Sequence, residues 1–261
     1  MERLIAAAEA AADVAGAVIR PFFRTHMAAD TKSDRSPVTI ADRTSELAMR
    51  AVLSERFPEH GVLGEEFGLT RPEAELRWVL DPIDGTRAFI TGRPTFGVLI
   101  GLLEGDRPIL GLIDQPITGE RWIGARGQPT LFRGGLGGKA GCRPCPRLED
   151  AELSCTSPEM LEGADMPRWR RLASKVRRNY WGGDCYAYGL LALGQIDIVA
   201  ESDMKIWDWV PLVAVVEGAG GKVTDWNGAP LRPDGDGRVL AVGDPALLPL
   251  AVAALNNPSV A

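Results

Sequence analysis

The stretch at residues 78–86, where an apolar run ends in two aspartates and a glycine, constrains the fold of this chain most strongly. The apolar run predicts a strand that ends at Asp81, because a proline follows and cannot extend the ladder. Asp84 then falls where the chain turns, and Gly85 allows the backbone to approach a ligand closely. Thr86 is placed to begin a helix. A strand, an acidic turn and a helix in succession indicate an architecture of packed helices and sheets.

The rest of the chain alternates between helical and strand patterns, without internal repeats. We therefore expect an α/β (α+β) layered fold in one catalytic unit, residues 1–261. Its halves, 1–140 and 141–261, are expected to meet at the glycine-rich hinge 134–141. Helices are predicted at residues 1–24 (ending near Pro21), after 38–42 until residue 58, and at 166–176, 186–193 and 207–217. Strands are predicted at residues 61–64, 77–80, 97–103, 109–114, 121–125, 152–155, 196–201 and 222–224.

The charge balance narrows the class of partner. The chain has 261 residues and a net charge of −6, with 35 acidic and 29 basic side chains. Nucleic-acid binding requires a basic surface, so a nucleic-acid partner is not expected. An acidic enzyme with an anionic substrate needs positive charge at its site, and bound metal is the obvious source. No uncharged apolar stretch approaches the ~20 residues of a membrane span, so no membrane partner is expected.

The four cysteines include one C-x-x-C pair, Cys142 and Cys145. No second pair completes a zinc set, and the only histidines, His26 and His60, lie far from it in sequence. Loop or core thiols are therefore favoured over a redox or metal role. Nothing in the sequence requires disulfides, so a cytoplasmic location is expected.

The acidic turn also has the composition of a cation site. Asp81 and Asp84 would hold a hard cation there, with the backbone carbonyl of Ile83 filling a further ligand position. The helix that follows would offer N–H groups to a phosphate. The alternative is that the two aspartates serve only as a turn residue and a helix cap.

Two further segments place carboxylates at similar positions. Glu65 and Glu66 directly follow a short apolar strand, and Asp208 lies between Trp207 and Trp209 at a helix start. For Asp208 the alternative is a helix cap beside core tryptophans. Carboxylates from distant segments that converge on one point would form a divalent-cation site.

These segments together resemble a known family. The motifs are Gly64-Glu65-Glu66, Asp81-Pro82-Ile83-Asp84-Gly85-Thr86, Trp207-Asp208 and Glu217-Gly218-Ala219-Gly220-Gly221. In this order they resemble the inositol monophosphatase family, from the first helix to the turn at residue 227. The resemblance implies a layered αβαβα sandwich of the inositol monophosphatase / fructose-1,6-bisphosphatase type. It also implies a magnesium-dependent phosphate monoester hydrolase with two or three Mg²⁺ per subunit, and a homodimer.

The resemblance also implies roles for individual residues. The first magnesium would be bound by Glu65, Asp81 and the carbonyl of Ile83. The second would be bound by Asp81, Asp84 and Asp208. Glu66 would support a ligand from behind. The catalytic group would be Glu65, Thr86 and Asp42, with Thr86 and Asp42 orienting the attacking water. Gly85 and Thr86 would hold phosphate oxygens through their N–H groups. Lys32 lies where the family often has a loop lysine, although a solvated surface lysine is the favoured alternative.

The choice of phosphate ester is expected to depend on the second half. Glu201 and Asp184 match positions that line the family's substrate pocket, although Asp184 is also placed to cap a helix. Two carboxylates there would favour a cationic substrate, and histidinol phosphate carries an amino group and an imidazole. Residues 111–124 and 183–188 are also similar to the histidinol-phosphatase branch. Histidinol phosphate, a small phosphorylated metabolite of histidine biosynthesis, is therefore the favoured substrate.

Other functions remain open from sequence. Within the class, the alternative substrates are inositol-1-phosphate and, less favoured, 3′-phosphoadenosine 5′-phosphate. A different class is a non-catalytic metal- or phosphate-binding regulator on the same fold. The intact acidic positions argue against a regulator, because a protein without catalysis has no need for all of them.

Overall fold

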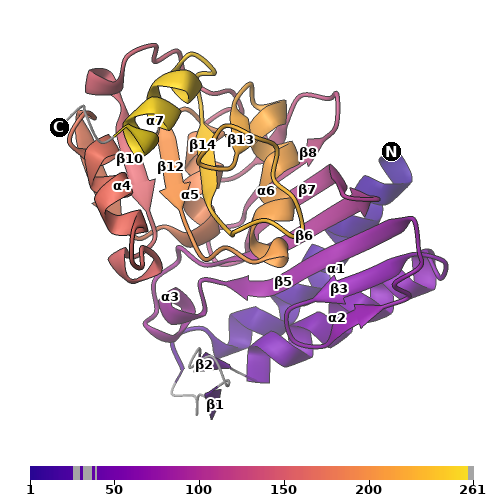
Figure 1. Cartoon of the computed structure of the whole chain (residues 1–261). Helices are drawn as coiled ribbons and strands as arrows, with labels where there is room; N and C mark the ends of the chain where they lie inside the picture. The colour runs from indigo at the N-terminus through magenta and orange to yellow at the C-terminus, as the bar shows by residue number, and fades with distance from the viewer. Residues whose placement is uncertain (26–29, 32–36, 39, 258–261) are drawn as a thin grey trace.

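The computed structural model describes residues 1–25, 30–31, 37–38 and 40–257. It has five layers, a pair of helices, a sheet, a second pair of helices, a second sheet and a third pair of helices (Figure 1). This order confirms the predicted αβαβα sandwich. The strands of the first sheet come from residues 61–133 and those of the second from 152–242, so the predicted boundary at 140/141 lies in the segment that joins the sheets.

The first sheet has seven strands in the order β4-β3-β5-β6-β7-β8-β9. Strands β3 and β5 are parallel, and the other pairs are antiparallel. The bounds are β3 Gly61–Gly64, β4 Gly68–Thr70, β5 Leu76–Asp84, β6 Gly97–Glu104, β7 Arg107–Gln115, β8 Glu120–Ala125 and β9 Leu131–Arg133.

Strand β5 corrects one prediction, because it continues past Asp81 to Asp84 instead of ending before the turn. The pairing with β6 runs through Asp81↔Leu99, shifts register, and resumes at Asp84↔Gly97. Such an irregularity accommodates a proline, which has no N–H to give to the ladder. The two aspartates therefore lie on one distorted strand end.

The outer face of the first sheet is covered by α1 (Glu2–Ile19) and α2 (Ile40–Arg56). One face of α1 carries alanines at helical spacing that are fully buried, which lets this helix lie close to its neighbours: Ala7, Ala8, Ala11, Ala12 and Ala15. The α-helix ends at Ile19 and a 3₁₀ turn, Arg20–Phe22, contains the proline, so the predicted helix of 1–24 is shorter than expected. The short strands β1 (Asp30–Thr31) and β2 (Pro37–Val38) pair with each other.

The second sheet has five strands in the order β11-β10-β12-β14-β13. Its outer face is covered by α4 (Asp165–Ala173) and α7 (Leu247–Asn256), which pack around buried Trp169 and Trp226. The strand bounds are β10 Glu152–Cys155, β11 Arg178–Trp181, β12 Ile198–Glu201, β13 Lys222–Thr224 and β14 Val239–Val242. Short 3₁₀ turns lie at Leu148–Asp150 (η2) and Pro158–Met160 (η3).

Helices α5 (Asp184–Leu191) and α6 (Ile206–Gly218) fill the layer between the sheets. Glycines paired across β6, β7 and β8 form the surface on which α6 lies. A Cβ at Gly111 would overlap the carbonyl oxygen of Pro211, and one at Gly124 would overlap that of Ala214. The missing side chains therefore set how closely α6, which carries Asp208, approaches the first sheet.

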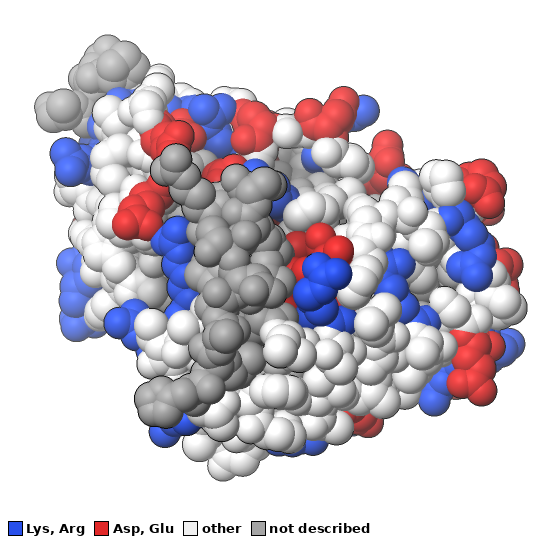
Figure 2. All heavy atoms as spheres, turned by 90° about the horizontal axis from the view of Figure 1, so that it is seen from below, with Lys and Arg blue, Asp and Glu red and all other residues white. Residues whose placement is uncertain are grey.

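Among the helices that the structure describes, none combines the length and apolar character needed to cross a membrane. On the face shown in Figure 2, acidic and basic side chains are interspersed among uncharged ones.

Candidate active site

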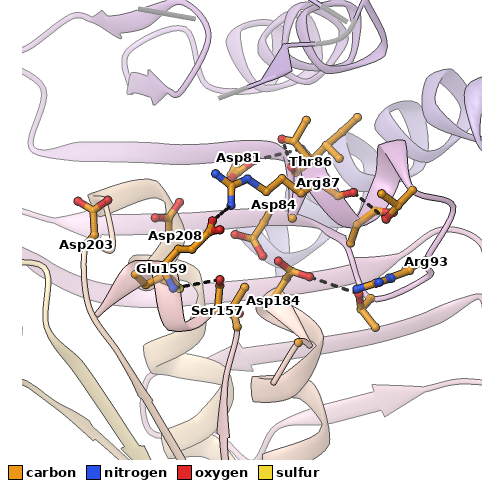
Figure 3. A pocket seen from close by; sticks show the side chains of 18 of the residues that line it. Asp81, Asp84, Thr86, Arg87, Arg93, Ser157, Glu159, Asp184, Asp203 and Asp208 are labelled. Atoms are coloured by element: carbon orange, nitrogen blue, oxygen red, sulfur yellow. Dashed lines mark hydrogen bonds and ion pairs between the residues drawn. The ribbon is translucent and has the colours of Figure 1, made fainter. Parts of the chain in front are cut away.

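A cavity of about 470 Å³ opens where the two halves of the chain meet. The end of β5 and the start of α3 (Thr86–Ile90) contribute one wall, and segments that precede α5 and α6 or follow β10 contribute the others. Figure 3 shows Asp81 and Asp84 of β5 gathered in this cavity with Asp184 of α5 and Asp208 of α6.

The first group of carboxylates in this region is Asp42, Glu65 and Asp81. One oxygen of each lies within 4.8 Å of one oxygen of the others. Asp42 lies in the first turn of α2, Glu65 follows β3, and Asp81 lies near the end of β5. The parallel pairing of β3 and β5 places the ends of both strands at one edge, and α2 packs over β5. Sequence reasoning placed Asp42 with Thr86, and the structure places it beside two predicted metal ligands.

The second group is Asp81, Asp84 and Asp208, again with one oxygen of each within 4.8 Å of the others. Asp81 belongs to both groups, and its expected role as a ligand shared by two metals stays a prediction. Carboxylate oxygens are the ligands that Mg²⁺ prefers. The two groups therefore have the donor chemistry of a site for hard divalent cations.

Backbone N–H groups hold each carboxylate of the second group. The N–H of Ile83 donates to Asp81 (3.0 Å), the N–H of Cys185 to Asp84 (2.7 Å), and the N–H of Lys205 to Asp208 (2.7 Å). Each bond uses one carboxylate oxygen, and a carboxylate has further lone pairs for a cation. The Lys205 contact also caps α6, so Asp208 has the alternative cap role, and its role as a metal ligand stays a prediction.

Crowded acids without a cation hold their protons more tightly than usual. Burial, followed by the charge of Glu65, raises the pKa of Asp81 well above its ordinary value. The pKa of Asp84 and the pKa of Asp208 are each raised to about 7, chiefly by burial. A divalent cation placed among these groups would favour their charged forms.

Glu46 is a positioning residue that sequence reasoning missed. Its fully buried carboxylate accepts hydrogen bonds from the N–H groups of Glu66 (2.7 Å) and Phe67 (3.3 Å), and from Arg50 (2.7 Å). A Cβ at Gly64 would overlap this carboxylate. Glu46 therefore fixes the turn that presents Glu65. Its position one helical turn after Asp42, facing the core, was the available signal.

The turn into α3 has the form that its sequence predicted. Gly85 adopts a left-handed conformation (φ +81°), and a Cβ there would meet Asp184 Cγ at 2.6 Å, so glycine is required. Helix α3 begins at Thr86, as predicted, and the Thr86 hydroxyl donates to the carbonyl of Ile83 (3.1 Å). A carbonyl has two lone pairs, so Ile83 retains one for a cation.

Asp184 lines the cavity at the first position of α5. It has a positive φ of 45°, uncommon for a residue other than glycine, and accepts a hydrogen bond from the Thr95 hydroxyl (3.3 Å). Burial and then Asp84 raise the pKa of Asp184 to about 7, while Arg93 acts in the opposite direction. A half-buried acid with a strained backbone in a cavity wall is typical of a functional position.

Glu201 lies behind the cavity wall and not among the described lining residues. Its carboxylate is fully buried and accepts hydrogen bonds from the Thr156 N–H (2.7 Å) and the Tyr188 hydroxyl (2.9 Å). Both of its oxygens are thus used to fix neighbouring elements. This placement differs from the expectation of a carboxylate that faces the substrate, and contact between Glu201 and substrate stays a prediction.

Two arginines, Arg87 and Arg93, also line the cavity. Sequence reasoning did not place either arginine at the site, because both residues belong to a short segment whose side-chain directions depend on the turn at Gly85. Glu66, the predicted support residue, lies 3.5 Å from Arg43 through its Oε2. Lys32 lies outside the described residues.

The four cysteines are free thiols. Burial raises the pKa of Cys142 to about 11 and the pKa of Cys145 in the same direction, which keeps both thiols protonated and unreactive. This favours the interpretation of the C-x-x-C pair as loop or core thiols.

The chain is similar in sequence and in structure to known phosphatases. The chain matches the model of the inositol monophosphatase family over residues 1–258. It is 47% identical over 230 residues to the protein named Bifunctional phosphatase IMPL2, chloroplastic, of Arabidopsis thaliana, and the match covers 87% of this chain and 66% of that protein. It is 38% identical over 210 residues to Histidinol-phosphatase of Mycobacterium tuberculosis, covering 76% of this chain and 78% of that protein. A solved inositol monophosphatase structure from Zymomonas mobilis, 48% identical, superposes with a TM-score of 0.89 over 98% of each chain.

Proposed function

This chain belongs to the inositol monophosphatase family and is a phosphoric monoester hydrolase, and we propose that its preferred substrate is histidinol phosphate. The reaction would release histidinol and phosphate in histidine biosynthesis, in the cytoplasm, from a homodimeric enzyme. The observation that carries the substrate choice is the half-buried carboxylate of Asp184 in the wall of the cavity that holds the acidic cluster.

Magnesium fits the donor set of this site, since every side chain in the two acidic groups is a carboxylate. We propose two or three Mg²⁺ ions, held by Glu65, Asp81, the Ile83 carbonyl, Asp84 and Asp208. When bound, magnesium supplies positive charge that activates water and stabilises the phosphoryl and leaving-group oxygens. Among the described residues, neither group includes a histidine or a cysteine, the ligands that zinc prefers. This composition favours a hard cation such as magnesium.

The chain's own residues would bind the phosphate group of the ester and orient the attacking water. The N–H groups of Gly85 and Thr86, at the start of α3, would hold phosphate oxygens. Thr86 donates a hydrogen bond from its hydroxyl to the carbonyl of Ile83, so its oxygen is available to accept a hydrogen bond from a water molecule. We propose that Asp42 and Glu65 share in orienting that water, because both lie in the group around Asp81. Glu66 would support this arrangement from behind.

The organic part of the ester would lie against Asp184. A cationic amino group or imidazolium beside this carboxyl would favour its charged form, and the ionised carboxylate would in turn bind the cation more tightly. Inositol phosphate offers only hydroxyl groups at the same place. Asp184 thus supplies a physical reason for discrimination between the two esters.

The test compares kcat/KM for histidinol phosphate, inositol-1-phosphate and 3′-phosphoadenosine 5′-phosphate in the wild-type protein and in Asp184→Asn. We expect histidinol phosphate to be preferred, and Asp184→Asn to lower its kcat/KM by about tenfold with little change for inositol-1-phosphate. An equal loss for both esters would remove the charge-recognition argument. A wild-type preference for inositol-1-phosphate would overturn the substrate assignment.

Inositol-1-phosphate is the second candidate substrate, supported by the similarity to the Zymomonas mobilis inositol monophosphatase. The same substrate panel separates these candidates. The non-catalytic alternative fails if any monoester releases phosphate in a magnesium-dependent manner.

A further inference from the structure

Arg87 and Glu159 form an ion pair between the two halves of the chain at the cavity that holds the acidic cluster. Arg87 Nη1 lies 2.6 Å from Glu159 Oε2, although the residues are 72 positions apart. Arg87 belongs to α3, Glu159 belongs to η3, and both line the cavity. Figure 3 draws the contact with both side chains among the labelled acids.

Arg87 is a basic residue in a cavity whose lining is mostly acidic. The described lining of the cavity includes the acids Glu65, Asp81, Asp84, Glu159, Asp184, Asp203 and Asp208. Against them it includes two arginines, Arg87 and Arg93. Arg93 lowers the pKa of Asp184, so its charge acts on the side of the cavity where that carboxyl lies. Arg87 is the arginine adjacent in sequence to Thr86, where the phosphate is expected.

The Arg87–Glu159 ion pair contributes little to the stability of the fold. Its two side chains are 69% and 72% exposed, and exposed ion pairs contribute little to stability. A guanidinium that is both solvated and paired with a single carboxylate exchanges partners readily. A phosphate dianion offers a guanidinium a stronger, bidentate set of acceptors than a solvated carboxylate does.

We propose that Arg87 is a phosphate-binding residue that leaves Glu159 and binds the phosphate group of the incoming ester. In the free enzyme Glu159 holds the guanidinium at the cavity and competes with the anion for it. The positive charge of Arg87 also reduces the repulsion that the acidic lining exerts on an approaching dianion. This inference rests on the hydrolysis of phosphate monoesters proposed above, but not on which ester is preferred.

Two single substitutions that break the same pair test the proposal. Arg87→Gln removes the phosphate contact, whereas Glu159→Gln removes the competitor and leaves Arg87 free. The probe is inorganic phosphate, titrated calorimetrically in the presence of Mg²⁺, together with kcat/KM for histidinol phosphate and inositol-1-phosphate. We expect Arg87→Gln to weaken phosphate binding by about tenfold. We expect Glu159→Gln to strengthen it by about two- to fivefold.

The matched control is Arg126→Gln. Arg126 also forms an exposed ion pair, 2.8 Å from Glu104, and lies outside the cavity lining. It loses the same charge and should leave phosphate affinity unchanged within about twofold. Thermal unfolding of all three variants checks that each is folded.

Three results would overturn the proposal. Equal weakening by Arg87→Gln and Glu159→Gln would show that the pair acts only as a structural contact. Unchanged phosphate affinity in Arg87→Gln would show that the guanidinium stays with Glu159. If Arg126→Gln weakened phosphate binding as much as Arg87→Gln, the loss of affinity would come from the change in net charge and not from the position of Arg87. Because inorganic phosphate has no organic part, these results do not depend on whether histidinol phosphate proves to be the substrate.

Discussion

The backbone N–H of Cys185, at the start of α5, donates a hydrogen bond of 2.7 Å to the carboxylate of Asp84, 101 positions earlier in the chain. This bond joins the two halves of the molecule at the second acidic group. It fixes one oxygen of Asp84 and leaves the other lone pairs for a cation. Asp84 is therefore both a contact between the halves and an expected metal ligand.

We predict that Asp84→Asn folds but loses metal and most activity. An asparagine retains an oxygen for the Cys185 N–H, so the contact between the halves survives. It loses the negative charge that would bind Mg²⁺, and metal ions supply several kcal/mol of charge stabilisation in such reactions. We expect kcat/KM to fall on the order of 100-fold or more, with weaker Mg²⁺ binding by calorimetry. Near-normal turnover would show that Asp84 is not a ligand.

Most of the acidic cluster could be predicted because its members lie in short, locally recognisable segments. Glu65 follows a strand, Asp81 and Asp84 lie at the end of a strand, and Asp208 lies at a helix start. The layered fold was also predictable from the alternation of helix and strand patterns. These features depend on neighbours within a few residues.

The features that sequence reasoning missed depend on contacts between distant residues. Glu46 acts on a turn about 20 positions away, and Glu201 turns toward Thr156 and Tyr188 instead of toward the cavity. The helical spacing of Glu46 shows that it faces the core, but no local pattern shows which distant groups either carboxylate contacts. The segment after residue 228 also went unassigned, although β14 and α7 complete the second sheet and its outer layer.

We predict that Glu46→Gln weakens Mg²⁺ binding by about 10- to 100-fold, the usual effect of losing a group that orients a ligand. A glutamine retains one accepting oxygen but cannot accept from Glu66, Phe67 and Arg50 as the carboxylate does. The turn that presents Glu65 should then lose its fixed geometry. The measurement is Mg²⁺ affinity by calorimetry, alongside kcat.

The control for Glu46→Gln is Glu55→Gln, an exposed glutamate further along the same helix. It changes the same charge without touching the turn and should keep wild-type Mg²⁺ affinity. Equal Mg²⁺ affinity in Glu46→Gln and wild type would mean that Glu65 is positioned by other contacts.

The metal-free protein should become less stable as pH rises from about 5 to about 8. Asp84, Asp184 and Asp208 have pKa values raised to about 7 in the folded chain, from 3.8 for an unperturbed carboxyl. The folded state therefore binds more protons than the unfolded state between these values, and the free energy of unfolding falls as pH rises through them. Below about pH 4 this difference has no further effect, because both states are protonated.

The measurement is the thermal unfolding temperature in chelator at about pH 5 and about pH 8, with an expected drop of at least a few degrees. Saturating Mg²⁺ should reduce the difference in unfolding temperature between the two pH values, because the cation compensates the carboxylates that repel one another at high pH. A metal-free protein that melts at a higher temperature at about pH 8 would contradict the prediction.

Gly111→Ala should reduce both stability and Mg²⁺ affinity, because the glycine surface of β6, β7 and β8 sets the position of α6. An added Cβ would overlap the carbonyl oxygen of Pro211, so α6 must shift, at a cost of about 1–3 kcal/mol in the free energy of unfolding. The shift would carry Asp208 away from Asp81 and Asp84, so Mg²⁺ binding should weaken as well.

Two further glycine substitutions serve as comparisons for Gly111→Ala. The Cβ added by Gly101→Ala would meet the side chain of Val210 at 2.7 Å, and this variant should give a milder form of both effects. Gly135→Ala, with open space around its Cβ, should change neither. If Gly111→Ala lowers the unfolding temperature but binds Mg²⁺ as tightly as the wild type, the close packing of α6 serves stability alone and does not position Asp208.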